Sequence, residues 1–175
     1  MEIKPIEDIL KIPAEDLPLM VFSDNPRSFV SYRIKARQKG SYNHFMWMIE
    51  PGKFASQDLM FHSVPAEKYF QSRLKFWHNP DWTAGEKNIL KSIIFKALKE
   101  PWYVRMYDWP QILGFMVGIR GLQLPWRKIC SDHVDVLRSV DQIWQSNKHR
   151  SPPEVHRVFK EREKYQVYGY FDPDV

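Results

Sequence analysis

The chain has 175 residues, a formal net charge of +5 and a hydrophobic content of 43%. This length and composition predict one globular domain over residues 1–175, with a core at about 17–170, and they exclude a disordered tail. No stretch approaches the roughly 20 apolar residues that a membrane-spanning helix needs. The N-terminus lacks the basic and apolar regions of a secretory signal, so we expect a cytoplasmic protein.

The N-terminal half of the chain predicts short elements, because prolines interrupt it. Apolar runs indicate strands, and the Pro-Gly pair at residues 51–52 is typical of a tight turn between two of them. In chain order we predict a strand at 17–22, a turn at 23–26, a helix at 27–37, strands at 42–49 and 54–61, and a short amphipathic helix at 66–76.

The C-terminal half predicts helices with clear start signals. Thr83 is a good N-cap, and Glu86 three residues later completes a capping box. That helix should run to about Leu98. Further helices are expected at 111–117, from Cys130 to about Trp144, and after Ser151, with a closing strand at 165–170. This order of elements predicts an α+β fold in which an antiparallel sheet packs against helices.

The single cysteine, Cys130, is the first candidate functional residue. One cysteine can form no intramolecular disulfide and no Cys-rich zinc site. Its expected position at the start of a helix would surround it with free N–H groups, which favour the thiolate and can stabilise an oxyanion. Lys128 adds positive charge nearby. The alternative is an inert, buried cysteine.

A thiolate nucleophile needs a base that a third group orients, and His44 in a predicted strand is our candidate base. If the 51–52 turn has two residues, strand pairing places Gln57 on the sheet face of His44. Gln57 is therefore the predicted orienting residue. A three-residue loop would change the parity and bring Ser56 or Asp58 to that face instead. A purely structural histidine at a sheet end is the alternative for His44.

Other sites have less support in the sequence. His133, one helical turn after Cys130, is a second candidate base. No His-x-x-x-His pair or clustered acidic spacing indicates a metal site, and no glycine-rich loop indicates a nucleotide site. We therefore expect neither a metal nor a cofactor. The basic residues are spread along the chain, and the densest patch, at residues 33–39, is expected to be a solvated helix face, so nucleic acid is not an expected partner.

One further pattern is an ordered set of segments at 19–22, 28–34, 40–45, 101–113, 129–134 and 151–155. In this order, these segments resemble those of the permuted papain-fold amidases of the NlpC-type superfamily (the YaeF/YiiX-like branch). The resemblance covers roughly residues 17–160. In that branch the strand that carries the histidine precedes the helix that carries the cysteine.

The resemblance implies a papain-like fold and a cysteine hydrolase or acyltransferase that acts on amide or ester bonds through a Cys-bound acyl intermediate. Cys130 would be the nucleophile and His44 the base. Gln57 departs from the Glu or His that the family commonly has as its third polar residue. The acyl substrate would be a peptide, a peptidoglycan stem, an isopeptide or a lipid ester. Candidate substrate-binding residues are Tyr42, Trp109 and Trp126.

A chain of this size and without an export signal also fits a non-catalytic interaction module. Such a module would retain the fold without the chemistry, for example as a phage-encoded or virion structural protein. The reactivity of Cys130 distinguishes it from the enzyme.

Overall fold

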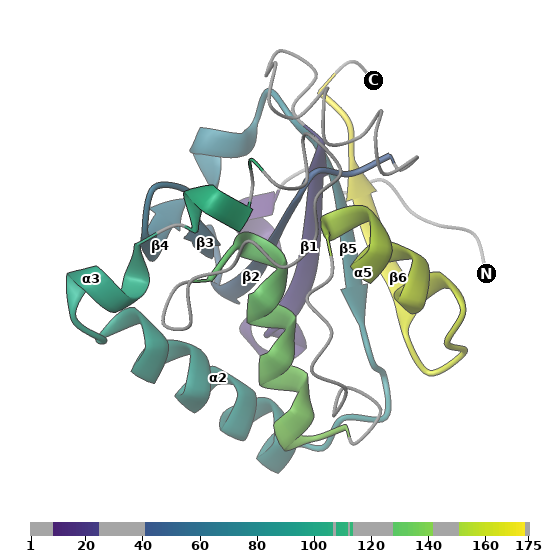
Figure 1. Cartoon of the computed structure of the whole chain (residues 1–175). Helices are drawn as coiled ribbons and strands as arrows, with labels where there is room; N and C mark the ends of the chain where they lie inside the picture. The colour runs from purple at the N-terminus through teal and green to yellow at the C-terminus, as the bar shows by residue number, and fades with distance from the viewer. Residues whose placement is uncertain are drawn as a thin grey trace.

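A six-stranded antiparallel sheet organises the part of the chain that the computed structural model describes (Figure 1). The structure describes residues 9–24, 41–106, 108–111, 113, 128–141 and 151–173, without the side chain of Ser131. The strand order is β4-β3-β2-β1-β5-β6. The strands are β1 (Leu19–Asp24), β2 (His44–Glu50), β3 (Lys53–Gln57), β4 (Phe61–Pro65), β5 (Arg73–His78) and β6 (Gln166–Phe171).

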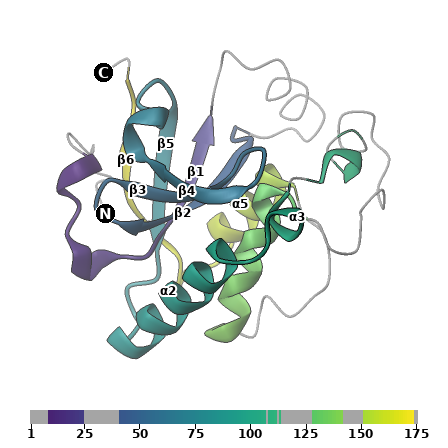
Figure 2. The same ribbon diagram turned by 90° about the vertical axis from the view of Figure 1, so that its left-hand side faces the viewer.

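Helices and short 3₁₀ segments cover both faces of the sheet. Figure 2 shows α2 and α5 on one side of the sheet and the N-terminal segment on the other. None of the helices in the described ranges is long and apolar enough to cross a membrane. The α-helices are α2 (Ala84–Leu98), α3 (Trp102–Arg105) and α5 (Pro152–Lys160), and the 3₁₀ helices are η1 (Ile9–Lys11), η2 (Ala14–Asp16), η3 (Ala66–Tyr69) and η4 (Cys130–Ser139).

The sheet separates two apolar cores, because side chains of a strand alternate between its faces. On one face, Phe45 and Trp47 of β2 pack with residues of α2, η4 and α5. On the other face, Met46 and Met48 of β2 pack with the N-terminal segment and with Tyr69 of η3. We call these the helix face and the η3 face. The predicted α+β class with an antiparallel sheet packed on helices is confirmed.

The hairpin of β2 and β3 contains the predicted turn and an unpredicted bulge. Gly52 has φ = +70°, which a residue without Cβ adopts readily. Glu50 pairs with Lys53, as a two-residue turn requires, but Met48 pairs with Phe54. The extra residue, Ile49, forms a β-bulge. From the bulge onward, the parity of the pairing is reversed relative to the sequence-based expectation.

Two predicted elements in this half of the chain are wrong. The helix expected at 66–76 is instead the short η3 followed by β5, where Leu74 and Phe76 are buried and alternate with the half-buried Lys75. This two-residue period is that of a strand, and β5 pairs with the free side of β1. The turn expected at 23–26 is also wrong at its start, because Ser23 and Asp24 continue β1.

The helix starts predicted at Thr83 and Ser151 are confirmed. Thr83 accepts from the backbone N–H of Glu86, whose carboxylate accepts in return from the Thr83 N–H, and this box begins α2. Ser151 and Glu154 begin α5 in the same way. The helix predicted at Cys130 is present as a 3₁₀ helix that ends at Ser139. The predicted helix at 27–37, most of that at 111–117, and Trp144 lie outside the described residues.

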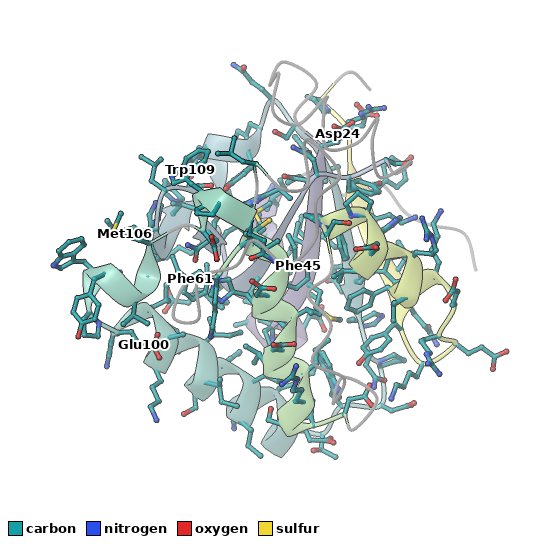
Figure 3. The ribbon with its side chains drawn as sticks, viewed as in Figure 1. Asp24, Phe45, Phe61, Glu100, Met106 and Trp109 are labelled. Carbon is teal, nitrogen blue, oxygen red and sulfur yellow. The ribbon has the colours of Figure 1, made fainter. Side chains whose placement is uncertain are left out.

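Three contacts of His133 fix η4 on the helix face of the sheet. The indole N–H of Trp47 donates to the His133 carbonyl at 3.0 Å. The His133 ring stacks on Phe61 with centroids 3.7 Å apart, and its Nε2 lies 2.8 Å from Oε1 of Gln57. Figure 3 shows Phe45 and Phe61 beside η4. Strands β2, β3 and β4 therefore all contribute to the position of the helix that begins at Cys130.

We predict that Trp47→Phe lowers the free energy of unfolding by about 1–2 kcal/mol more than Trp77→Phe does, because a lost buried hydrogen bond leaves a carbonyl unsatisfied. Trp77 is the matched control: it is also buried, but its indole N–H has no hydrogen-bond partner. Urea denaturation of both variants measures the difference. Equal losses would contradict a stabilising role for the Trp47–His133 bond.

Candidate active site

His44, at the start of β2, is held by a polar network on the η3 face. Its Nε2 lies 2.8 Å from Oγ of Ser56, and Ser56 donates to Oδ1 of Asp58 at 3.1 Å. The Tyr69 hydroxyl lies 2.6 Å from the Ser56 Oγ and donates to the same carboxylate oxygen at 3.0 Å. Lys68 forms an ion pair with Oδ2 of Asp58. The network thus joins β2, β3 and η3.

The hydrogen bonds around Ser56 favour one tautomer of His44. An ionised carboxylate only accepts, so Asp58 is the end of the chain. The hydroxyls of Ser56 and Tyr69 have one hydrogen each, and they serve the contacts of both with Asp58 and with each other. When Ser56 donates its hydrogen to Asp58 or to Tyr69, its oxygen accepts from Nε2–H of His44. Nε2 then carries the proton and Nδ1 holds the free lone pair. A neutral imidazole in this tautomer can take a proton at Nδ1.

The electrostatics keep the imidazole neutral. Burial lowers the pKa of His44, the charge of Asp58 opposes this effect and the charge of Lys68 adds to it, and the resulting pKa is about 4. For Asp58, burial alone would raise the pKa, but the charge of His44 and the bonds from Lys68 and Tyr69 hold it below the ordinary value. At neutral pH the pair is therefore a neutral base beside an ionised carboxylate.

The predicted role of Gln57 as the partner of His44 is wrong. The bulge at Ile49 reverses the pairing parity, so Ser56 occupies the face of His44 and Gln57 points to the helix face. There its Oε1 lies 2.8 Å from His133, and its amide donates to the carbonyl of Arg105 at 2.8 Å. The alternatives Ser56 and Asp58 are the residues that the structure brings to His44.

Cys130 begins η4 and is 1% exposed. Its negative charge would raise the pKa of the Tyr69 hydroxyl, after the larger effects of burial and Asp58. That hydroxyl is 3.4 Å from Nε2 of His44. The thiol therefore lies near the end of the sheet where β2 begins and β3 ends, although η4 packs on the helix face and His44 points to the η3 face. No hydrogen bond joins His44 to Cys130.

His133, the second candidate base, makes its hydrogen bonds to Gln57 and Trp47. It is buried, its ring nitrogen is hydrogen-bonded to Gln57, and its carbonyl accepts from Trp47. Burial, Lys128 and His44 all lower the pKa of its imidazole well below the ordinary value. These contacts favour a structural role for His133 in holding η4.

The three predicted substrate-binding residues differ in their positions. Tyr42 packs its ring against Phe22 and His156 in the helix-face core, with centroids 6.1 and 4.6 Å away. Trp109 is exposed (Figure 3). Trp126 lies outside the described residues. Of the described residues, Tyr42 and Trp109 are therefore not brought together around His44.

A cleft of about 410 Å³ lies between α2 and η4. Its lining includes His133, one turn after Cys130, but not Cys130 itself. Charged residues of both signs surround it. They are Lys96, Glu100, Lys128, Asp132, Asp135 and Arg138. The cleft is thus beside the candidate site rather than in it.

The described residues contain no group of three or more His, Cys, Asp or Glu side chains that could hold a metal ion. Comparison with known proteins adds no further assignment: no protein-family model matches the chain, and no curated protein sequence matches it significantly.

Tyr69 and Lys68 were not predicted from the sequence as residues of the His44 network. Both fall in the segment that was predicted to be a helix at 66–76, where neither would be expected near His44. The alternation of polar and apolar residues over Arg73, Leu74, Lys75 and Phe76 is the signal that could have corrected this, because a strand there makes 66–69 a connection beside β3. Nothing in the local sequence distinguishes these two residues from ordinary surface positions.

We predict that Ser56→Ala removes the single tautomer of His44, whereas Gln57→Leu retains it. Ser56 provides the acceptor for Nε2–H, and Gln57 faces the other side of the sheet. The imidazole ¹⁵N chemical shifts of His44 report which nitrogen is protonated. If Gln57→Leu altered the tautomer and Ser56→Ala did not, the orienting role would belong to Gln57.

We predict that the free energy of unfolding falls as the pH is lowered from 6.5 to 4. In this window the unfolded chain binds protons that the native imidazoles of His44, His133 and His156 resist, so stability is lost with acid. For His44 alone the loss reaches about 3 kcal/mol near pH 4. Urea denaturation at several pH values should give a shallower dependence for His44→Gln. An unchanged slope in that variant would contradict a depressed pKa for His44.

Proposed function

We propose that the chain is a cysteine hydrolase or acyltransferase with a permuted papain-like fold, in which Cys130 is the nucleophile and His44 the general base. The observation that carries this proposal is the network on His44. An imidazole with its Nε2–H bonded to Ser56 has its Nδ1 available as a base, and its lowered pKa keeps it neutral at neutral pH.

The third polar component in this proposal is Ser56 together with Asp58, in place of Gln57. Ser56 transmits the effect of the carboxylate to the imidazole, because it accepts from His44 and donates to Asp58. Tyr69 braces both oxygens from η3. When the imidazole gains a proton during the reaction, the nearby Asp58 carboxylate, 3.7 Å from Nε2, stabilises the imidazolium.

The proposed reaction has two stages. His44 Nδ1 takes the proton from the Cys130 thiol as the sulfur attacks the substrate carbonyl, and a C–S bond forms. The C–N or C–O bond to the leaving group then breaks, and the imidazolium returns the proton to that group. Water, or another acceptor that His44 deprotonates, attacks the thioester and releases both the acyl group and the thiol. No oxidant or cofactor is required.

The fold gives this proposal partial support. The histidine is on a strand that precedes the cysteine-bearing helix in sequence, and that helix packs on the same antiparallel sheet. This is the order that the resemblance to permuted papain-fold amidases implies. The acyl substrate class that we propose remains peptide, peptidoglycan or lipid-like.

One observation favours the alternative, an interaction module without catalysis. Cys130 is buried and has no hydrogen bond to His44, and η4, which begins at Cys130, packs on the face opposite the His44 network. Catalytic hydrogen bonds are often long in the absence of substrate and shorten when substrate binds. The accessibility of the thiol in the native protein decides between the two functions.

We predict that iodoacetamide alkylates Cys130 of the native protein at pH 7, and that His44→Gln slows the reaction on the order of 10²-fold, the usual contribution of a general base. Asp58→Asn should slow it less, because the base remains but loses its fixed orientation. Alkylation is followed by intact mass over time.

His62→Gln is the matched control, because His62 is a half-buried neighbour of the same carboxylate, with Nε2 3.8 Å from Oδ2 of Asp58. Its alkylation rate should equal that of the unmodified protein. Circular dichroism confirms that each variant is folded. A thiol that reacts only after denaturation, or a rate that His44→Gln leaves unchanged, would support the inactive module.

A further inference from the structure

A group of exposed apolar side chains lies at the β4 side of the molecule, and we call it the aromatic platform. Its members are among the most exposed large apolar residues of the described chain. They are Leu59 (70% exposed), Trp102 (62%), Leu113 (57%), Tyr103 (55%) and Trp109 (44%). A protein surface rarely presents so many large apolar side chains together unless they contact something.

Direct contacts connect several of the segments that carry these residues. Trp102 and Tyr103 are both on α3, with ring centroids 6.0 Å apart. Met106, just after α3, forms a β-bridge with Met60, and this places Leu59 beside α3. Figure 3 shows Met106 and Trp109 on the same side of the molecule, and α3 lies there too.

The platform is not a flat face or a groove. Trp102 and Tyr103 project from a four-residue helix, Leu59 from the β3–β4 turn, and Trp109 and Leu113 from a helical turn where residues four apart share one side. Because these side chains protrude separately, they fit a deformable partner that can surround each of them. Trp and Tyr are the residues that settle at the level of lipid headgroups, with an apolar body and a polar tip.

The charges around the platform complement an anionic surface. Lys96 and Lys99 lie at the end of α2, directly before α3, and Lys128 is next to Trp109 through the bond from Asp108 N–H to the Lys128 carbonyl. All three lysines are exposed. Among the nearby carboxylates, Glu100 is half-buried.

The remaining acidic groups in this region have hydrogen-bond or ion-pair partners. Asp132 accepts from the Ile129 N–H at 2.9 Å, Asp108 is buried and accepts from Gln111 N–H, and Asp135 pairs with Arg138 at 3.2 Å. Beside the aromatic side chains, the three exposed lysines therefore outnumber the exposed carboxylates, because Asp135 is paired with Arg138 and Glu100 is half-buried.

From these observations we propose that the aromatic platform docks the protein on the surface of an anionic lipid bilayer. The side chains of α3 and the two turns enter the headgroup region, and the three lysines contact lipid phosphates and carboxylates. This docking does not depend on chemistry at Cys130. It would operate in an enzyme and in an inactive module alike.

The test measures binding of the full chain to vesicles by flotation. Vesicles of phosphatidylcholine with phosphatidylserine should retain the protein, and pure phosphatidylcholine vesicles should retain on the order of ten times less. Trp102→Ser combined with Tyr103→Ser should weaken binding at least tenfold on the anionic vesicles. Lys96→Gln combined with Lys99→Gln should weaken it on the order of tenfold, and only on those vesicles.

Two controls make the result specific. Ile89→Ser removes an exposed apolar side chain of α2 outside the platform and should leave binding unchanged. Cys130→Ser should also bind normally, so a failure of the proposed catalysis is separable from a failure of docking. Inorganic phosphate at millimolar concentration should not release the protein, since a bilayer rather than a free anion is the ligand.

Absence of binding to either vesicle, or binding that the aromatic double variant leaves intact, would overturn the proposal. Release by free phosphate would show a soluble-anion site instead. If the protein forms a complex with another protein through Trp102 and Tyr103 and ignores vesicles, the platform is a protein interface and the membrane assignment is wrong.

Discussion

The β-bulge at Ile49 is the constraint on which the candidate site depends. A two-residue turn alone would place Gln57 on the face of His44, but one additional residue in β2 reverses every pairing beyond it. Ser56 then meets His44, and Gln57 meets His133 on the other face. A single inserted residue thus separates the two polar residues of β3 into different roles, one in the His44 network and one in holding η4.

Each face of the sheet carries its own polar network at the same end of the sheet. On the helix face, His133 is surrounded by contacts from three strands, and these determine where η4 begins. On the η3 face, a carboxylate, two hydroxyls and a lysine surround His44. Buried polar groups are costly unless they are satisfied, so both networks specify the local geometry as well as contributing to stability. The chemistry that we propose requires the thiol at the start of η4 to meet the base across this end of the sheet.

Much of the fold could be predicted from local signals. The capping boxes at Thr83 and Ser151, the turn at Gly52 and the order of most strands depend on residues close in sequence. The helix prediction for 66–76 was wrong because the mixture of apolar and polar residues there also fits a helix. A strand is favoured only once it is known that β1 needs a second partner strand. For the site, His44 and Cys130 could be chosen as candidates, but the partner of His44 could not. The bulge that decides it has no signature in the residues at 48–50, and Tyr69 comes from an element that was predicted wrongly.

In the proposed reaction, Cys130 forms a covalent acyl intermediate with the help of His44. Incubation with p-nitrophenyl acetate, followed by acid quenching and peptide mass analysis, measures this most directly. We predict one acetyl group on the peptide that contains Cys130, formed rapidly in the unmodified protein, much more slowly in His44→Gln and not at all in Cys130→Ser. Acetylation confined to lysines, or equal labelling of Cys130 with and without His44, would contradict it.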